Sequence, residues 1–395
     1  MKHAAVRHQH SDAADRPFLV IWESTRACPL ACRHCRAEAQ PSRHPRELTT
    51  EEATLLMAQV ASFGHPPPLF VITGGDPFQR PDLFELVQRG TAMGLPVAVS
   101  PSGTPTLTRD ALERLHQAGA RALSLSVDGA TARTHDAFRQ VDGVFDLTVA
   151  AWRAAREIGL KVQVNTTVHR QNLLELPDIA CLVRDLGAMT WSAFLLVPTG
   201  RATALDALTP SEVEDVLSWL YDVGTVVPTK TTEGHHFRRV VLERQVLEDR
   251  GVDPVEVLGL GPLYQRLLKR AAVRDLLDQG TRRRRPPMDV NAGRGFAFVS
   301  HVGSVHPSGF LPVTAGDVRT TPLPRTYRTA RVFTSLRDTS LLTGRCGRCE
   351  FASVCGGSRS RAYAVTGDPL AEEPWCGYEP GSFPFQDDLA ALMGA

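Results

Sequence analysis

Seven of the eight cysteines in this 395-residue chain fall into two tight groups. The first group is Cys28, Cys32 and Cys35. Three thiolates can bind three irons of a [4Fe–4S] cluster, and the fourth iron then keeps an open coordination position. A closed structural zinc or iron–sulfur site needs a fourth ligand, and His34 is poorly placed for that role because it lies directly between two of the cysteines. The spacing therefore favours a reactive cluster over a structural one.

The second group, near the C-terminus, contains four cysteines: Cys346, Cys349, Cys355 and Cys376. Four thiolates form a closed set that suits either Zn²⁺ or a [4Fe–4S] cluster, and their number alone does not choose between the two. The remaining cysteine, Cys181, lies in an apolar helical pattern and is expected to be a small core residue.

The elements that must position these cysteines form a repeated strand–helix pattern. Six short apolar runs predict strands: Leu19–Trp22, Leu69–Thr73, Val97–Ser100, Leu123–Val127, Val162–Val168 and Trp191–Val197. Amphipathic segments lie between them, and Thr49 with Glu52 forms a capping box that opens a helix predicted over Glu51–Phe63. Repeated βα units predict an α/β fold, a partial (β/α)6 barrel whose active face lies at the C-terminal strand ends. The first cysteine group follows the first strand and so belongs at that face.

Small polar residues follow several of the predicted strands. After the second strand, Gly74 and Gly75 allow close backbone approach to a ligand, and the carboxylate of Asp76 can face an ammonium group. In isolation, each such residue is equally well explained as part of a satisfied turn. The residues at these strand ends are Gly74, Gly75, Asp76, Pro77, Ser102, Ser126, Asp128 and Asn165.

The Cys-x3-Cys-x2-Cys spacing after an initial strand resembles the radical S-adenosylmethionine (SAM) superfamily. The resemblance implies that the open iron chelates SAM, which is cleaved reductively to a 5′-deoxyadenosyl radical that abstracts a substrate hydrogen atom. It also implies that the eight strand-end residues named above are the candidates for cofactor contacts with SAM. Gly74-Gly75-Asp76-Pro77 resembles the family's Gly-Gly-Glu motif with Asp in place of Glu, and His34 stands where an aromatic residue is common. A one-electron reductant such as flavodoxin or ferredoxin is also implied. His135-Asp136-x-x-Arg139 resembles a stretch common in one subgroup, although capping and a salt bridge explain it equally well.

The C-terminal pattern, Cys-x2-Cys-x5-Cys with a later cysteine, resembles the SPASM domain of radical SAM enzymes. The full pattern has seven cysteines for two auxiliary clusters, whereas this chain has Asn291, Ser308 and Arg359 where three of them are expected. The resemblance thus implies one auxiliary [4Fe–4S] cluster on the four tail cysteines. Such a saturated cluster suits electron transfer, or holding the domain together.

Composition limits the partners and the location. Lys and Arg number 44 against 43 Asp and Glu, so no global field attracts nucleic acid or an anionic membrane. No apolar run approaches the ~20 residues that span a bilayer, and the start of the chain lacks a signal-peptide core, so a cytoplasmic location is expected.

The expected organisation is a disordered tail (1–16), a radical SAM core (17–205), a helical insert or linker (206–290) and a SPASM-like domain (291–395). Within the insert, His235, His236, Arg238 and Arg239 are expected either to meet a carboxylate-rich substrate or to form a solvated helix face. The run Arg282–Arg285 is interpreted as a solvated boundary.

The resemblance implies a maturase that acts on a peptide or on a tetrapyrrole or other cofactor precursor. Two alternatives stay open. One is a purine- or tRNA-directed radical SAM enzyme, for which a tail cluster with three protein ligands is expected instead of four. The other is a zinc-stapled binding or regulatory protein without turnover. The sequence identifies no substrate-side acid or base.

Overall fold

The structure is a computed structural model that describes residues 6–7, 12–277 and 284–394. Its frame is one ten-stranded sheet in the order β10-β9-β8-β1-β2-β3-β4-β5-β6-β7. Strands β8 and β1 to β7 run parallel, and β9 and β10 add an antiparallel edge. The strands are β1 (Leu19–Glu23), β2 (Leu69–Thr73), β3 (Val97–Val99), β4 (Ala122–Ser126), β5 (Lys161–Val168), β6 (Thr190–Leu195), β7 (Thr229–Thr232), β8 (Phe296–Val299), β9 (Ser304–His306) and β10 (Gly316–Asp317).

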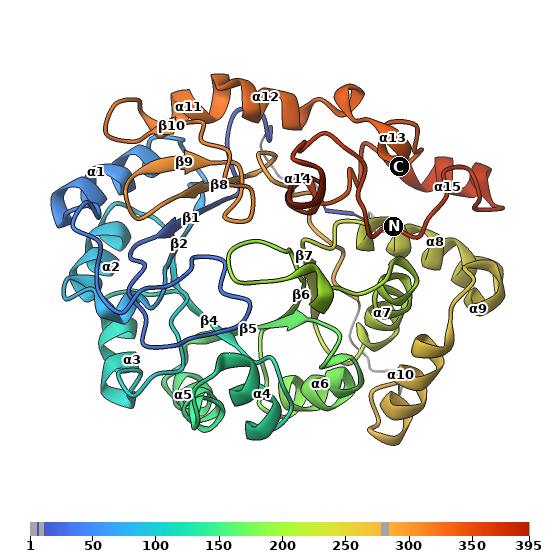
Figure 1. Ribbon diagram of the computed structural model, residues 1–395, viewed down its shortest axis with the longest axis horizontal. Helices are drawn as coiled ribbons and strands as arrows, with labels where there is room; N and C mark the ends of the chain where they lie inside the picture. Colours follow the sequence, from blue (N-terminus) through green and yellow to red (C-terminus); the bar gives the residue numbers. More distant parts are fainter. Residues whose placement is uncertain (1–5, 8–11, 278–283, 395) are drawn as a thin grey trace.

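The helices that follow β1 to β6 form an arc outside the strands (Figure 1). These helices are α1 (Thr50–Ala61), α2 (Leu83–Ala92), α3 (Arg109–Gln117), α4 (Ala132–Arg139), α5 (Val144–Ile158) and α6 (Leu176–Asp185). The predicted capping box at α1 is present, because the Thr49 hydroxyl accepts from the Glu52 amide and the Glu52 carboxylate accepts from the Thr49 amide. The α/β class and the six predicted strands are confirmed.

The predicted insert is part of the sheet rather than a linker. It contributes β7, which pairs with β6, together with α7 (Pro210–Val223), α8 (Phe237–Arg250), α9 (Pro254–Val257) and α10 (Pro262–Val273). Helix α8 is buried from Phe237 through Arg244, which corrects the expectation of a solvated face. Arg238, Arg239 and Glu243 of that segment, and His236 immediately before it, are each under 5% exposed.

The C-terminal region is equally continuous with the sheet, since β8 pairs with β1 in parallel. Its helices are short: α11 (Leu323–Thr329), α12 (Arg331–Arg337), α13 (Gly344–Gly347), α14 (Arg359–Thr366) and α15 (Gln386–Met393). Helix α15 packs against α8, so the insert lies between the strands and the tail (Figure 1).

The predicted disorder of residues 1–16 is wrong for the part of that stretch that the structure describes. Val6 is buried, Arg7 pairs with Met288 in an isolated parallel bridge, and Asp15 forms an ion pair with Arg328. His3, His8 and His10 lie outside the described residues, as do Arg282 and Arg283 of the arginine run. Arg284 and Arg285, which are described, bond to Tyr221 and Thr190. No helix in the described ranges has the length and apolar character needed to cross a membrane.

Candidate active site and cluster sites

The loop after β1 places Cys28, Cys32 and Cys35 in one cleft. Residues from the C-terminal ends of β2 to β6 form the rest of its wall, as expected for the active face of a parallel barrel. Six of the eight predicted cofactor contacts line this cleft: Gly74, Gly75, Ser102, Ser126, Asp128 and Asn165.

Gly74 and Gly75 allow the cysteine loop to lie directly on the end of β2. A Cβ on Gly74 would stand 2.4 Å from the carbonyl oxygen of Thr25, and one on Gly75 would stand 2.4 Å from that of Ala27. The Gly75 amide donates to the Thr25 carbonyl at 2.7 Å, and the Asp76 amide donates to the Ala27 carbonyl at the same distance. Any side chain at either glycine would therefore displace the loop that carries the cysteines.

Asp76 does not face the cleft, which corrects the expectation that its carboxylate meets an ammonium group. The carboxylate is fully buried and accepts from the Phe78 amide (3.2 Å), the Ser102 amide (3.4 Å) and the Thr104 hydroxyl (3.1 Å). Burial raises the pKa of Asp76 despite these bonds. Pro77, which begins a short 3₁₀ helix, is also buried outside the cleft wall. Both residues thus position the loops that follow β2 and β3.

Ser102, in the loop after β3 that Asp76 positions, lies beside the first cysteine of the cleft. Its hydroxyl donates to the Gly75 carbonyl at 3.1 Å and lies 3.7 Å from the sulfur of Cys28. Burial raises the pKa of Cys28 to about 11. A bound iron–sulfur cluster holds its cysteines as thiolates, so the buried Cys28 would exchange its proton for the positive charge of iron.

Arg139, at the end of α4, places a positive charge in the wall of the same cleft. Its guanidinium forms an ion pair with the fully buried Asp128 and donates to the sulfur of Cys32 at 3.6 Å. Burial opposes ionisation of Asp128, but Arg139 together with His34, His135 and the Thr167 amide outweighs it and holds the pKa of that carboxyl well below its usual range. The Thr167 amide also donates to Asp128, at 2.7 Å. Of the stretch from His135 to Arg139, only Arg139 lines the cleft, through the salt bridge that the sequence left open. Asp136 has the capping role instead, because its carboxylate accepts from the amides of Gly143 and Phe145 at the start of α5.

His34 is held by a stack of three rings. Its ring centroid lies 4.4 Å from that of Phe138, which in turn lies 3.9 Å from that of His169. Burial lowers the pKa of His34 to about 3, so the imidazole is neutral at pH 7. His34 thus occupies the aromatic position of the motif as an aromatic ring would, with its face against Phe138.

The four tail cysteines line a second cavity. The amides of Gly357 and Glu373 donate to the sulfurs of Cys355 (3.4 Å) and Cys346 (3.3 Å). Burial raises the pKa of Cys349 and Cys355 to about 12 and that of Cys376 to about 11. Backbone donors aimed at sulfur are the surroundings that thiolate ligands of a cluster receive.

Among the described residues, no three His, Cys, Asp or Glu side chains converge closely enough to hold a single metal ion. A four-iron cluster spreads its ligands over a cube rather than drawing them to one point. The two cysteine-lined cavities are compatible with such a group.

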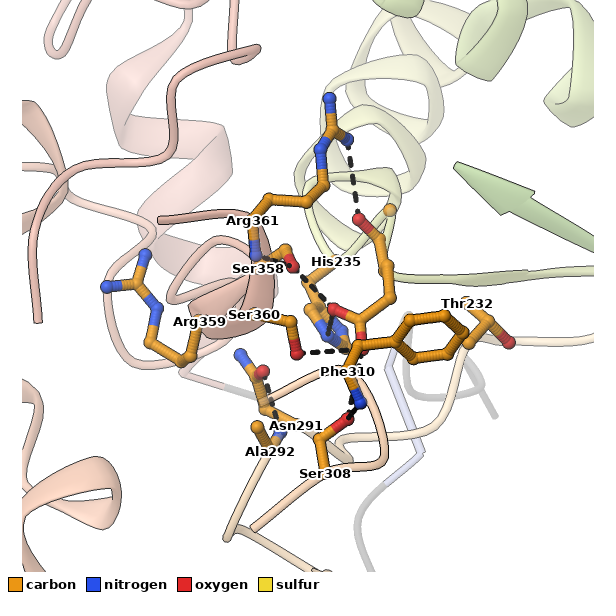
Figure 2. A network of polar contacts seen from close by, with 12 residues as sticks. Thr232, His235, Asn291, Ala292, Ser308, Phe310, Ser358, Arg359, Ser360 and Arg361 are labelled. Carbon is orange, nitrogen blue, oxygen red and sulfur yellow. Dashed lines mark hydrogen bonds and ion pairs between the residues drawn. The ribbon is translucent and has the colours of Figure 1, made fainter. Parts of the chain in front are cut away.

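Of the residues that replace the three expected cysteines, Asn291 and Ser308 lie beside a polar network around Glu233, whereas the side chain of Arg359 points away and donates to the carbonyls of Pro369 and Ala371 (Figure 2). The Asn291 amide donates to the Gly357 carbonyl at 2.7 Å, and the Ser308 hydroxyl donates to the buried carboxylate of Glu233 at 3.3 Å. Ser358 and Ser360 donate to the same carboxylate. The side chains of Asn291 and Ser308 thus make hydrogen bonds to protein groups at two of the positions where the full SPASM pattern has cluster ligands.

Comparison with known proteins agrees with this geometry. The family model "Radical SAM superfamily" matches residues 22–182. An AdoMet-dependent heme synthase of Methanosarcina barkeri is 40% identical over 367 residues, which are 92% of this chain and 97% of that protein. An Fe-coproporphyrin III synthase of the same organism is 32% identical and covers 92% of this chain and 88% of that protein. The Streptococcus suis SuiB structure with bound S-adenosylmethionine has a TM-score of 0.66 at 12% identity, covering 92% of this chain and 78% of SuiB.

The chain belongs to the radical SAM superfamily. It is an enzyme of the maturase kind that uses SAM and a [4Fe–4S] cluster.

Proposed function

We propose that Cys28, Cys32 and Cys35 hold the SAM-binding cluster and that the substrate is a tetrapyrrole with propionate side chains. The observation that carries the choice of substrate is the 40% identity to an AdoMet-dependent heme synthase across nearly the whole of both chains. The relative named Fe-coproporphyrin III synthase, at 32% identity, supports the same substrate class.

When bound, the reduced cluster and SAM supply a radical that removes a hydrogen atom from the substrate. The chain's own residues supply position and surroundings. Gly74 and Gly75 hold the cysteine loop against β2, and Ser102, Ser126 and Asn165 offer polar contacts to SAM from the neighbouring strand ends. Arg139 neutralises Asp128 and donates to Cys32, which keeps the wall of the cleft free of unpaired charge.

The outer part of the cleft suits a flat conjugated substrate with carboxylates. Phe194 and Phe310 line it with aromatic rings whose centroids lie 6.4 Å apart. Arg36 lines both this cleft and an adjoining one of about 550 Å³, where its guanidinium bonds to the buried Glu23 at 2.6 Å. Aromatic faces pack on a macrocycle, and a guanidinium binds carboxylates.

We propose that the enzyme converts a propionate side chain of the substrate to a vinyl group, and this conversion determines which atoms and electrons the substrate loses. Removal of one hydrogen atom from the carbon next to the ring is followed by loss of carbon dioxide and one further electron. We propose that Cys346, Cys349, Cys355 and Cys376 hold the auxiliary [4Fe–4S] cluster and that its role is electron transfer. A flavodoxin or ferredoxin is the proposed source of the electron that initiates the reaction.

The test is anaerobic reconstitution with iron and sulfide, followed by incubation with dithionite, SAM and Fe-coproporphyrin III. The proposal expects 5′-deoxyadenosine together with a porphyrin that has lost carbon dioxide and two hydrogen atoms from a propionate side chain. Formation of 5′-deoxyadenosine with an unchanged porphyrin would refute this substrate. A precursor peptide would then be the next candidate, since the SuiB fold, solved with its precursor peptide, is similar to this one.

A further inference from the structure

His236 is a buried histidine that the proposed reaction does not use. It is the N-cap residue of α8, in the insert between the sheet and the tail. Its side chain is fully buried, and neither ring nitrogen has a hydrogen-bond partner in the part of the chain that the structure describes. It lines the cavity that contains the four tail cysteines.

The buried imidazole of His236 needs a hydrogen-bond acceptor that the described protein groups around it do not supply. Burial and nearby arginines lower the pKa of His236 well below its usual value, so the ring is neutral and carries one N–H donor. A buried donor without a partner destabilises a fold, and such groups are rare. The cavity is therefore where the N–H of His236 would find an acceptor.

The neighbours of His236 restrict what that acceptor is. Arg239, one turn along the same helix, lines the cavity too, but its guanidinium is bound to Glu214 and Glu243. Around the cysteines, the donors Gly357, Glu373 and Arg359 already point at sulfur. Glu373 lines the cavity as well, but its carboxylate already accepts from the amides of Ser358 and Trp375 and pairs with Arg361. Among the described side chains of the cavity, the sulfur atoms are thus the acceptors left for His236.

We propose that the His236 N–H donates a hydrogen bond to a sulfur of the [4Fe–4S] cluster held by the tail cysteines, so that α8 sets the reduction potential of that cluster. The inference rests on the proposed function, which places the auxiliary cluster there. Four thiolates already complete the ligand set, so the imidazole is a donor and not an iron ligand.

The direction in which His236 shifts the reduction potential of the cluster follows from charge. Reduction adds one negative charge, which is shared by the sulfurs, and a hydrogen bond to a sulfur is stronger when that sulfur is more negative. His236 therefore stabilises the reduced cluster and raises its potential.

The experiment isolates the tail cluster in a full-length Cys28→Ala/Cys32→Ala/Cys35→Ala protein, reconstituted anaerobically and titrated under EPR detection. His236→Leu removes the donor, and the ratio of reduced to oxidised cluster at a fixed potential should fall roughly tenfold, which is a shift of about 59 mV for one electron. His236→Gln retains an N–H donor and should stay near the parent value. His235→Leu is the matched control: His235 bonds to Arg238 and is not among the residues that line the cavity, so no shift is expected.

Equal potentials for the parent and His236→Leu, at equal iron content, would overturn the inference. If the His236→Leu variant does not hold iron, a second measurement tests the inference without it. Pulsed EPR of the parent with ¹⁵N-labelled histidine should show a weak nitrogen coupling to the reduced cluster that His236→Gln abolishes, and the absence of that coupling would overturn the inference as well. If the parent binds no tail cluster at all, both the inference and the auxiliary-cluster part of the proposed function are wrong. If His236→Leu keeps an intact cluster and its reduction potential is unchanged, the inference is wrong but the auxiliary-cluster part of the proposed function stands.

Discussion

The pair of Arg139 and Asp128 offers the sharpest test of how the cleft is built. The side chain of Asp128 is 0% exposed and that of Arg139 is 11% exposed. Replacing Arg139 with Met would keep most of the side-chain volume but leave a buried carboxylate without its cation. Breaking a buried ion pair in this way costs about 3–5 kcal/mol of unfolding free energy. We expect about 3 kcal/mol, at the lower end, because the Thr167 amide still donates to Asp128.

The pH dependence follows from the pKa of Asp128. In the parent protein that pKa is lowered, so the stabilisation is present above the unfolded value of ~3.9 and is lost only as pH falls through the folded value. In Arg139→Met, burial acts without the arginine and raises the same pKa above ~3.9, so the variant regains stability as pH falls. The deficit should therefore be largest at pH 7 and smaller at pH 5.

Urea denaturation of the cluster-free protein at both pH values measures the effect. Arg133→Met is the matched control, an exposed arginine on the same helix, and should change the free energy of unfolding by less than ~0.5 kcal/mol. Adding Asp128→Asn to Arg139→Met should recover part of the loss, because no charge is then left buried. A loss below ~1 kcal/mol that does not vary with pH would refute the reasoning.

Three other predictions concern the two cysteine sites and the network between them. Gly75→Ala places a Cβ 2.4 Å from the Ala27 carbonyl oxygen, so iron analysis should show loss of the first cluster with the tail cluster retained; full iron content would contradict this. Cys376→Ala should do the reverse, losing tail-cluster iron and stability while the first cluster still forms, and an unchanged iron content would exclude Cys376 as a ligand. Burial raises the pKa of Glu233, so the charged form of its carboxyl group is disfavoured in the folded protein. The parent should therefore lose stability relative to Glu233→Gln as pH rises above the ordinary carboxyl range. Thermal melts at pH 5 and pH 8 test this, and an equal change in the melting temperatures of the two proteins would contradict it.

The barrel strands could be predicted because each is a short apolar run that ends at polar residues. Strand β7 was missed because Thr229–Thr232 reads TKTT, without apolar residues, and its place in the sheet depends on pairing with β6. Strand β8 was missed because Phe296–Val299 lies in a stretch dominated by glycine, proline and turn signals, and its partner β1 is far away in sequence.

The charged segment of α8 shows why burial was misjudged there. Arg238 and Arg239 look solvated in sequence, but Arg238 donates to the carbonyls of Val354 and Cys355. Arg239 is matched by Glu214, from the preceding helix, and by Glu243. The pair with Glu243 is four residues along the same helix and is visible in the sequence, but the contacts with Glu214, Val354 and Cys355 join distant segments and have no local sequence signal.

In the site, the cysteine spacing and the position of the two glycines after β2 were sufficient to place the cleft. The orientation of Asp76 was not predictable, because its partners Ser102 and Thr104 follow a different strand. Arg139 carried a signal in the His135-Asp136-x-x-Arg139 stretch, but its contact with Cys32 depends on how α4 packs over the cysteine loop.

The central claim is that Cys28, Cys32 and Cys35 hold the cluster that cleaves SAM. It is tested most directly by assaying 5′-deoxyadenosine with mass spectrometry after anaerobic incubation of the reconstituted protein with dithionite and SAM. The parent and Cys181→Ala, which removes a thiol outside both cavities, should produce it, and the Cys28→Ala/Cys32→Ala/Cys35→Ala protein should not. Reductive cleavage of SAM by the triple variant would contradict the claim.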